Sequence, residues 1–218
     1  MRRNNFLRFT VTALCLIIVL QASAQSGPPK EQNKREADLI ELKKLDIRYA
    51  TANNFVGRAV YPEARAFLQR PAAEALVRAH KLLKKEGLGI VIFDGYRPWA
   101  ITKLFWEVVR EDQRKYVADP AKGSKHNRGC AVDLSIYDLK TGWSVAMPSG
   151  FDEFTERASP DYKGGTTEET ANRNKLRRLM EAEGFTVNAN EWWHFDYKDW
   201  ESYAIYDISF AEASKKKK

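Results

Sequence analysis

The sequence predicts a single α+β domain with a mainly antiparallel sheet and helices packed on one face. Some segments have apolar residues at helical spacing, others are short branched or alternating runs, and turn-forming residues separate them. Neither a repeat nor a long linker interrupts residues 37–212, so one domain accounts for this stretch. Because helices are interspersed with hairpin-connected strands, the α+β class is favoured.

The sequence of the first half of the domain predicts a helix, a strand and a second helix. Alanine and leucine recur at helical spacing between Pro71, which suits a helix start, and Gly87, which suits its end, so a helix is expected at about 71–86. Residues 90–93 are branched and aromatic, as in a strand buried on both faces. A second helix with one apolar side is expected to begin at Pro98.

The second half predicts further strands and one more helix. The spacing of Thr166 and Glu169 is that of a capping box, for a helix that ends at Gly184. The remaining expected segments are a strand at 130–137, a turn at 138–142 into a strand at 143–147, a loop at 148–165, and late strands at 185–187 and 192–197.

The positive charge of the chain is concentrated at its two ends. The formal charge is +7, with 36 basic and 29 acidic residues. Three of the basic residues lie in residues 1–24 and four form the run 215–218, which leaves 29 to balance the acids. The body is therefore neutral, and no nucleic-acid partner is expected. A lysine-rich tail at 213–218 is expected to be solvated, and a surface-binding tag or an added sequence stays open as an alternative.

Residues 1–24 have the pattern of a secretory signal peptide. A basic start is followed by the apolar run 11–20 and by the small-x-small pattern Ala-Ser-Ala at 22–24. About twenty apolar residues are needed to cross a bilayer, so no stable membrane span is expected after cleavage. We expect an exported, periplasmic or extracellular protein with a flexible lead-in at 25–36. Cys130 is then its only cysteine, which excludes an internal disulfide.

His126 and Asp133 form the first candidate for chemistry. In a strand at 130–136, Asp133 shares one face with Ala131 and Ser135, while Cys130 and the aliphatic residues share the other. A carboxylate buried in a sheet is costly unless it is paired, protonated or bound to a cation. Asp133 is therefore a candidate metal ligand.

The segment Glu-Trp-Trp-His at 191–194 supplies the second candidate. Two histidines and one carboxylate can hold Zn²⁺ with a fourth position open to water or substrate, so a zinc site at the sheet is expected. Glu191 could take a proton from that water. In a regular strand Glu191 and His194 face opposite ways, so both reach one metal only across a turn, bulge or twist.

Arg97 follows the strand expected at 90–93, in the segment Asp-Gly-Tyr-Arg-Pro at 94–98. Glycine and proline fix the backbone there, and a guanidinium keeps its charge at working pH. Arg97 therefore suits an oxyanion that develops during attack on a carbonyl.

Each candidate also has an ordinary structural explanation. Taken singly, His126 and His194 are more often hydrogen-bonded polar residues than metal ligands. Asp133 could cap a turn, Arg97 could pair with a surface acid, and Glu191 could be solvated. Their joint occurrence favours a functional site.

Five segments, in a fixed order between about residues 38 and 210, carry a family resemblance. They are Asp-Ile-Arg-Tyr-Ala-Thr-x-Asn-Asn-Phe-x-Gly at 46–57, Gly-Tyr-Arg-Pro at 95–98, Ser-x-His-x-x-Gly-x-Ala-x-Asp at 124–133, Gly-Phe-Asp-Glu-Phe at 150–154 and Glu-Trp-Trp-His at 191–194. In these segments the sequence resembles the D-alanyl-D-alanine dipeptidases, a family of zinc peptidases.

The resemblance implies a role for each of the candidates. One Zn²⁺ per chain would be bound by His126, Asp133 and His194. Glu191 would be the general base and later the proton donor, and Arg97 would stabilise the tetrahedral intermediate.

The resemblance also implies a substrate site for a D,D-dipeptide. Ser124 and Asp152 would hold the free ammonium group, with Glu153 as a neighbouring alternative for the charge contact. The expected function is hydrolysis of D-alanyl-D-alanine to two D-alanines by metal-activated water. A D,D-carboxypeptidase, another peptidoglycan peptidase and a non-catalytic cell-wall peptide-binding protein stay open, and the sequence sets no oligomeric state.

Overall fold

The computed structural model describes residues 27–215, so the signal expected at 1–24 and residues 216–218 of the expected tail lie outside the described residues. Four strands pair antiparallel in the order β3-β4-β6-β5, and β1 and β2 form a separate antiparallel pair. The strands are β1 (Leu39–Glu41), β2 (Phe67–Gln69), β3 (Leu88–Asp94), β4 (Ala131–Asp138), β5 (Phe185–Asn188) and β6 (Glu191–Tyr197). The helices are α1 (Arg70–Lys85), α2 (Trp99–Val108), α3 (Thr167–Ala182) and α4 (Phe210–Ala213). The predicted single α+β domain with an antiparallel sheet is confirmed.

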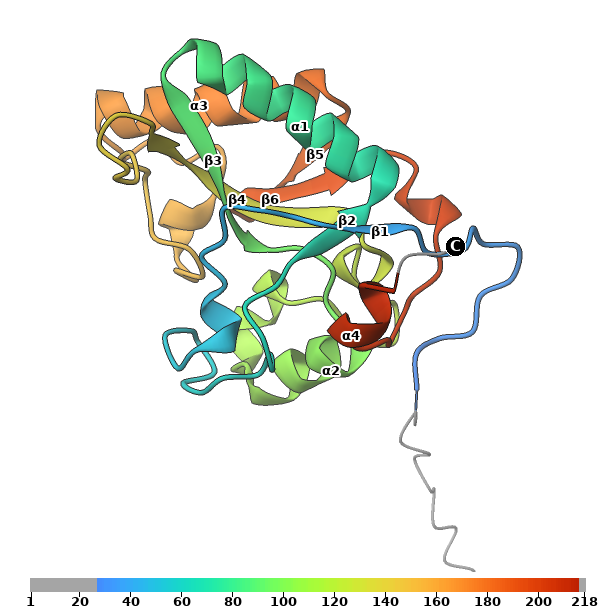
Figure 1. The fold of residues 1–218 in the computed structure, drawn as a ribbon. Helices are drawn as coiled ribbons and strands as arrows, with labels where there is room; N and C mark the ends of the chain where they lie inside the picture. Colours follow the sequence, from blue (N-terminus) through green and yellow to red (C-terminus); the bar gives the residue numbers. More distant parts are fainter. Residues whose placement is uncertain (1–26, 216–218) are drawn as a thin grey trace, which may run out of the picture.

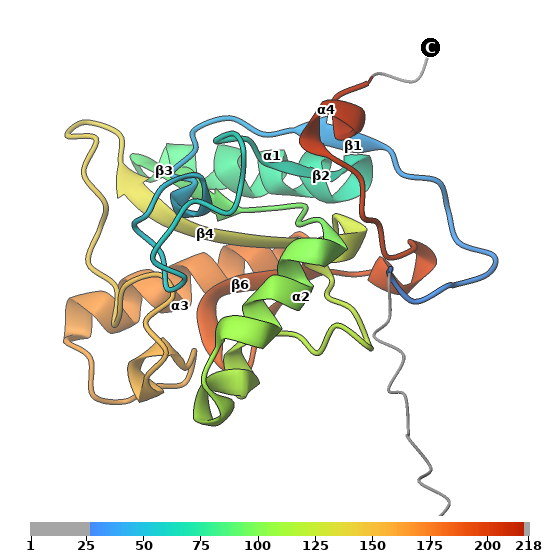
Figure 2. The same ribbon diagram turned by 90° about the horizontal axis from the view of Figure 1, so that it is seen from below.

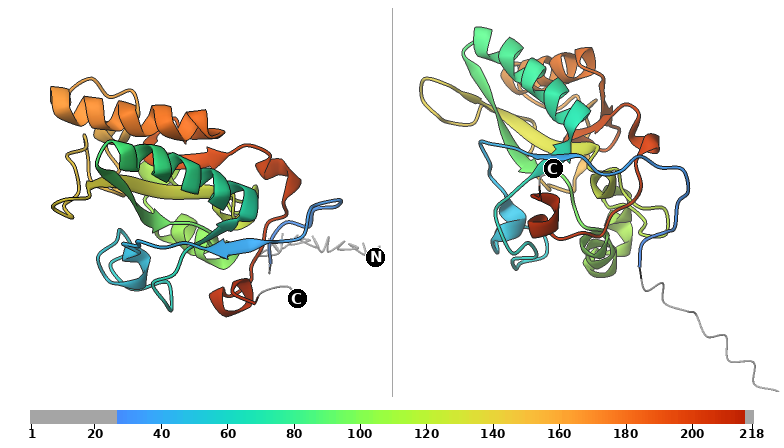
Figure 3. Two further views of the ribbon diagram at one scale, coloured as in Figure 1. Left: turned by 45° about the horizontal axis from the view of Figure 1, so that its top comes forward. Right: turned by 45° about the vertical axis from the view of Figure 1, so that its right-hand side comes forward.

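The two long helices cover one face of the four-stranded sheet. α1 and α3 run side by side above the strands, whereas α2 lies on the opposite side (Figure 1; Figure 3). Seen from below, α2 stands in front of the sheet (Figure 2). The expectation of helices on one face therefore holds for α1 and α3 and is wrong for α2, which lies on the other face.

Local sequence accounts for both long helices. The alanine and leucine stripe of α1 is buried, with Ala72, Ala75 and Ala79 fully covered, and Gly87 after the helix has a positive φ of 75°. At the start of α3, the Thr166 hydroxyl accepts the Glu169 N–H and the Glu169 carboxylate accepts the Thr166 N–H. The predicted capping box is confirmed.

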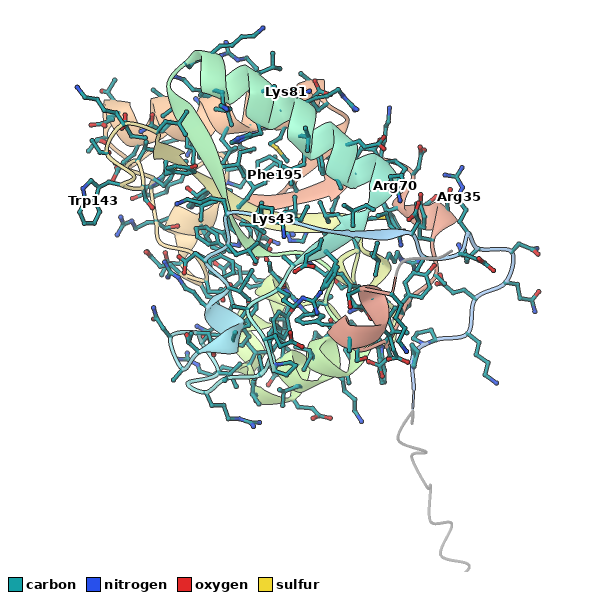
Figure 4. All side chains as sticks on the ribbon, in the orientation of Figure 1. Arg35, Lys43, Arg70, Lys81, Trp143 and Phe195 are labelled. Atoms are coloured by element: carbon teal, nitrogen blue, oxygen red, sulfur yellow. The ribbon has the colours of Figure 1, made fainter. Side chains whose placement is uncertain are left out.

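The strand predicted at 143–147 does not form. After the turn, only Ser144 pairs, in an isolated bridge with Tyr137. Trp143 is 78% exposed and projects away from the body (Figure 4). Only Val145 and Met147 of this segment pack against the core, and both are partly exposed. The segment therefore makes one bridge to β4, and its alternating apolar residues do not form a shared buried face because Trp143 stays in solvent.

The part of the expected lead-in that the structure describes makes specific contacts with the domain. The Glu31 carboxylate accepts two hydrogen bonds from the Arg128 guanidinium, at 2.9 and 2.8 Å, and one from the Ile205 N–H at 2.9 Å. Arg35 forms a parallel bridge with Tyr203. This segment therefore lies along residues 202–205. Within residues 27–215, no helix combines the length and hydropathy that crossing a bilayer requires.

Candidate functional site

Strand register brings the candidate ligands together on the sheet. Asp133 of β4 lies opposite His194 of β6 and, on its other side, opposite Asp94 of β3. His126 begins a short 3-10 turn (His126–Arg128) that leads into β4, and Gly129 ends this turn with a positive φ of 68°. All three candidate ligands are buried, and their ligand atoms lie within 4.8 Å of one another.

The distances among these three atoms fit a tetrahedral metal site. Nε2 of His126 lies 3.1 Å from Nδ1 of His194 and 3.4 Å from Oδ1 of Asp133. Nδ1 of His194 lies 3.1 Å from the same Asp133 oxygen. Ligands about 2.0 Å from a tetrahedral zinc ion are about 3.3 Å apart. The three atoms thus have the spacing of one face of such a tetrahedron.

The outer partners of the two imidazoles set which nitrogens carry protons. Nδ1 of His126 lies 2.7 Å from the Gly95 carbonyl oxygen, and Nε2 of His194 lies 2.8 Å from Oδ1 of Asp196. Both oxygens only accept, so these nitrogens donate, and the nitrogens that face Asp133 present lone pairs. Among residues 27–215, Oδ1 of Asp133 is a buried oxygen without a hydrogen-bond donor. Three electron-pair donors at this spacing fit a bound cation.

The electrostatics of the cluster also favour a positive charge. Burial opposes ionisation of His194, but the Asp196 and Asp133 carboxylates raise its pKa well above the ordinary value. Burial would raise the pKa of Asp133, yet the imidazoles of His126 and His194 hold it below the ordinary value. Either a proton or a metal cation would supply the positive charge that these carboxylates favour.

Glu191 reaches the cluster because β6 is irregular. Its Oε2 lies 3.7 Å from Nδ1 of His194. The register of β5 with β6 shifts between Val187 and Asn188, which supplies the irregularity that the sequence required. Burial, with a further contribution from the Asp133 carboxylate, raises the pKa of Glu191 to about 8. Such a carboxyl group can take up and release a proton near neutral pH.

Arg97 is fixed by a buried ion pair. Its Nε and Nη2 donate to Oδ2 of Asp94 at 3.0 and 2.8 Å, and the other Asp94 oxygen accepts the Tyr61 hydroxyl at 2.8 Å. Burial opposes the charge of Arg97, but Asp94 keeps its pKa well above the ordinary value. Nη2 of Arg97 lies 3.7 Å from Oδ2 of Asp133. The guanidinium therefore places a permanent positive charge beside the cluster of His126, Asp133 and His194.

Asp152 and Ser124 lie at the same cavity. Asp152 has a positive φ of 59°, and its Oδ2 accepts the Tyr49 hydroxyl at 2.8 Å. Burial and the nearby Asp133 carboxylate raise the pKa of Asp152 to about 7. The Ser124 hydroxyl oxygen accepts the His126 N–H at 3.2 Å. Glu153 instead accepts the Gly150 N–H at 3.1 Å, so it turns back on its own loop.

One cavity of about 530 Å³ contains all seven side chains that the sequence singled out. They are Arg97, Ser124, His126, Asp133, Asp152, Glu191 and His194. Aromatic and basic residues complete the wall, among them Phe105, Trp106, Tyr116, Trp200, Arg114, Lys122 and Lys125. The cavity is therefore polar and charged around the cluster.

Sequence reasoning missed three residues that hold this site. Asp94 lies three residues before Arg97, and Asp196 lies two residues after His194 on the same strand face, so local spacing could have indicated both. Tyr49 is separated from Asp152 by 103 residues. No local pattern connects these two, and only the fold brings them into contact.

Comparison of the sequence with known proteins identifies one family. A family model described as "D-ala-D-ala dipeptidase" matches residues 36–215. The D-alanyl-D-alanine dipeptidase of Escherichia coli (strain K12) is 34% identical over 167 residues, which cover 77% of this chain and 85% of that protein. The dipeptidase of the same name from Enterococcus faecalis is 35% identical over 180 residues, covering 74% and 89%. A solved structure of VanYB in complex with D-Ala-D-Ala is similar at 15% identity with a TM-score of 0.44, covering 82% and 85%.

Proposed function

The chain belongs to the D-Ala-D-Ala dipeptidase family, and from this premise we propose that it hydrolyses D-alanyl-D-alanine to two D-alanines at the cavity of Asp133. The observation that carries the proposal is the buried cluster of His126, Asp133 and His194, whose ligand atoms lie within 4.8 Å of one another and include an Asp133 oxygen without a hydrogen-bond donor. These three residues would hold one Zn²⁺. Bound there, the ion would supply a Lewis acid that polarises the scissile carbonyl and lowers the pKa of a water molecule.

Glu191 is the proposed general base. Its carboxyl group lies beside the cluster and is buried, and its pKa of about 8 suits proton exchange near neutral pH. Glu191 takes the proton of the attacking water and later gives it to the leaving amine. One group can serve both steps because the amine becomes basic as the peptide bond breaks.

Arg97 is the proposed stabiliser of the oxyanion. Attack on the peptide carbonyl turns a neutral oxygen into an anion, and a fixed cation lowers the energy of that state more than of the substrate. Asp94 holds the guanidinium in place before the substrate arrives, so little reorganisation is needed.

Asp152 and Ser124, which line the same cavity, are the proposed site for the free ammonium group of the dipeptide. A carboxylate at this end of the cavity selects substrates with a charged amino terminus. It disfavours acylated or longer peptides, in which an uncharged amide takes the place of the ammonium group. This preference would distinguish a dipeptidase from a D,D-carboxypeptidase.

A substrate panel tests the function. Purified protein with Zn²⁺ is expected to release D-alanine from D-Ala-D-Ala, and scarcely from N-acylated or longer D,D-peptides. The opposite preference would identify a carboxypeptidase. Binding of the dipeptide with zinc present but without any cleavage would identify a non-catalytic binding protein.

Glu191→Gln tests the mechanism. The amide cannot accept the proton of water, so kcat is expected to fall about a thousandfold. Zinc content should be retained because Glu191 is outside the three-residue cluster. Glu156→Gln changes an exposed carboxylate outside the cavity and serves as the matched control. Wild-type turnover in Glu191→Gln would remove Glu191 as the base.

We also propose that the protein acts outside the cytoplasm, as the pattern of residues 1–24 supports. There it would meet D-Ala-D-Ala among cell-wall fragments. N-terminal sequencing of the exported protein should begin at Gln25. A mature protein that retains residues 1–24 in the cytoplasm would contradict this location.

A further inference from the structure

Two residues that have no place in the proposed reaction, Lys125 and Asp196, lie behind the proposed zinc ligand His194. We propose that Lys125 and Asp196 form a positioning pair that orients His194 and thereby increases the affinity of this chain for zinc. The inference rests on the proposed zinc site and names two residues that determine how well that site holds its ion.

The two oxygens of the Asp196 carboxylate have different partners. Oδ1 lies 2.8 Å from Nε2 of His194, and Oδ2 lies 3.2 Å from Nζ of Lys125. On the far side of the imidazole, Nδ1 of His194 faces Oδ1 of Asp133 at 3.1 Å. A continuous series of polar contacts therefore runs from Lys125 through Asp196 and His194 to the centre of the cluster.

The alternation of β6 places Asp196 behind His194. Phe195 is fully buried and lies between the sheet and the long helices (Figure 4). Its neighbours His194 and Asp196 therefore share the opposite face of the strand, which is the face of the cavity. The residue paired with Asp196 on β4 is Ala131, whose small side chain leaves room for the carboxylate.

Lys125 is held in place from two directions. Its backbone lies between Ser124 and the ligand His126, and its ammonium group lies 5.2 Å from the centre of the Trp200 ring. The Lys125 side chain is 40% exposed, whereas that of Asp196 is 16% exposed. Lys125 thus covers the outer side of a carboxylate that is largely enclosed.

The effect on the metal follows from the hydrogen bond that Asp196 accepts. A carboxylate that accepts Nε2–H fixes the tautomer of the imidazole and the direction of its ring, and it makes Nδ1 a stronger donor to a metal. A half-exposed lysine contributes little energy of its own. Its role is to stop the Asp196 carboxylate from rotating away from His194.

Zinc affinity, measured by competition with a chromophoric chelator and without substrate, tests the pair. Asp196→Ala should weaken zinc binding about 10- to 100-fold. Asp196→Asn should lose less, because the amide oxygen can still accept the Nε2–H. Lys125→Met should weaken binding several-fold in the wild-type background and have no further effect in Asp196→Ala.

Lys122→Met is the matched control for Lys125→Met. Lys122 lines the same cavity, and it takes no part in the ion pairs shown for residues 27–215. Removing its charge should leave zinc affinity unchanged. Equal losses in the two lysine variants would overturn the pair, because a general charge effect would then explain both. Wild-type zinc affinity in Asp196→Ala, with unchanged circular dichroism, would also overturn the proposal that Lys125 and Asp196 orient His194.

The zinc measurement separates this inference from the proposed function. A wild-type protein that binds zinc and does not cleave D-Ala-D-Ala would overturn the function, while the variant affinities would still decide the role of Lys125 and Asp196. A wild-type protein that binds no zinc would overturn both.

Discussion

Neighbouring carboxylates in this site differ because each has a different partner. Asp94 is neutralised by Arg97, whereas Oδ1 of Asp133 has no donor and remains for a cation. Asp152 has a neutral partner, the Tyr49 hydroxyl, and burial raises its pKa to about 7. At the residue scale, the partner determines whether a carboxylate is structural, metal-binding or titratable.

Tyr49→Phe is expected to change the pH dependence of substrate use. The proposed base requires an ionised Glu191 and the proposed ammonium contact requires an ionised Asp152, so kcat/KM should fall below about pH 8 and more steeply below about pH 7. The Tyr49 hydroxyl donates to this carboxylate and lowers its pKa. Without the hydroxyl, the steeper fall due to Asp152 should begin about one pH unit higher. Tyr206→Phe, which removes a hydroxyl bound to the Arg35 carbonyl oxygen, is the control. A steeper fall that begins at an unchanged pH in Tyr49→Phe would argue against Asp152 as the ammonium site.

Asp94→Asn is expected to affect both stability and turnover. The variant removes the charge that is hydrogen-bonded to the buried Arg97 guanidinium and leaves Asp133, at 3.7 Å, as a charged neighbour, which should cost about 3 kcal/mol of unfolding free energy in urea denaturation. Because Arg97 would then be less firmly placed, kcat should fall about a hundredfold. A variant with wild-type stability and kcat would show that Asp94 does not hold Arg97.

At the element scale, strand register creates the site. Asp133 lies opposite both Asp94 and His194, and a shift of one residue in β4 would turn Asp133 toward the long helices. The helix spacing of α1 and the capping box of α3 were predictable because both depend on residues within a few positions of one another. The absent strand at 143–147 was not, because its formation depends on packing against the core.

Thr166→Ala tests the separation between the helical layer and the site. Loss of the capping hydroxyl should lower the unfolding free energy by about 1 kcal/mol. Because α3 covers the face of the sheet opposite the cavity, kcat/KM for D-Ala-D-Ala should stay at the wild-type value. Thr167→Ala removes a hydroxyl that does not cap the helix and should have a smaller effect on stability. A large loss of activity in Thr166→Ala would contradict this separation.

At the scale of the whole molecule, the beginning of the described chain is tied to the site. Glu31 binds Arg128, which lies two residues after His126, and it also accepts the N–H of Ile205 near the other end of the chain. Arg128 is itself buried and also donates to the Tyr203 carbonyl oxygen. Three distant segments therefore meet at one guanidinium beside the turn that carries a candidate ligand.

Glu31→Gln is expected to lower the unfolding free energy by about 2 kcal/mol at pH 7, measured by urea denaturation. Burial would raise the pKa of Glu31, but Arg128 holds it below the ordinary value of 4.5. The ionised form therefore stabilises the fold above pH 4.5, and this contribution is lost as the pH falls further. The difference in unfolding free energy between wild type and Glu31→Gln should therefore become smaller as the pH falls below 4.5. A difference that does not depend on pH would show that charge is not its cause.

The sequence by itself determined the fold class, the long helices, and the residue types and spacing of the candidate zinc ligands, because these depend on local pattern and on segments recognisable in order. It also indicated that Glu191 and His194 need an irregular strand, which the register shift of β6 supplies. The tertiary structure alone decided which groups complete the site. Contacts such as Tyr49 with Asp152 and Lys125 with Asp196 join residues 103 and 71 positions apart, and only strand pairing and loop packing bring such side chains within hydrogen-bonding distance.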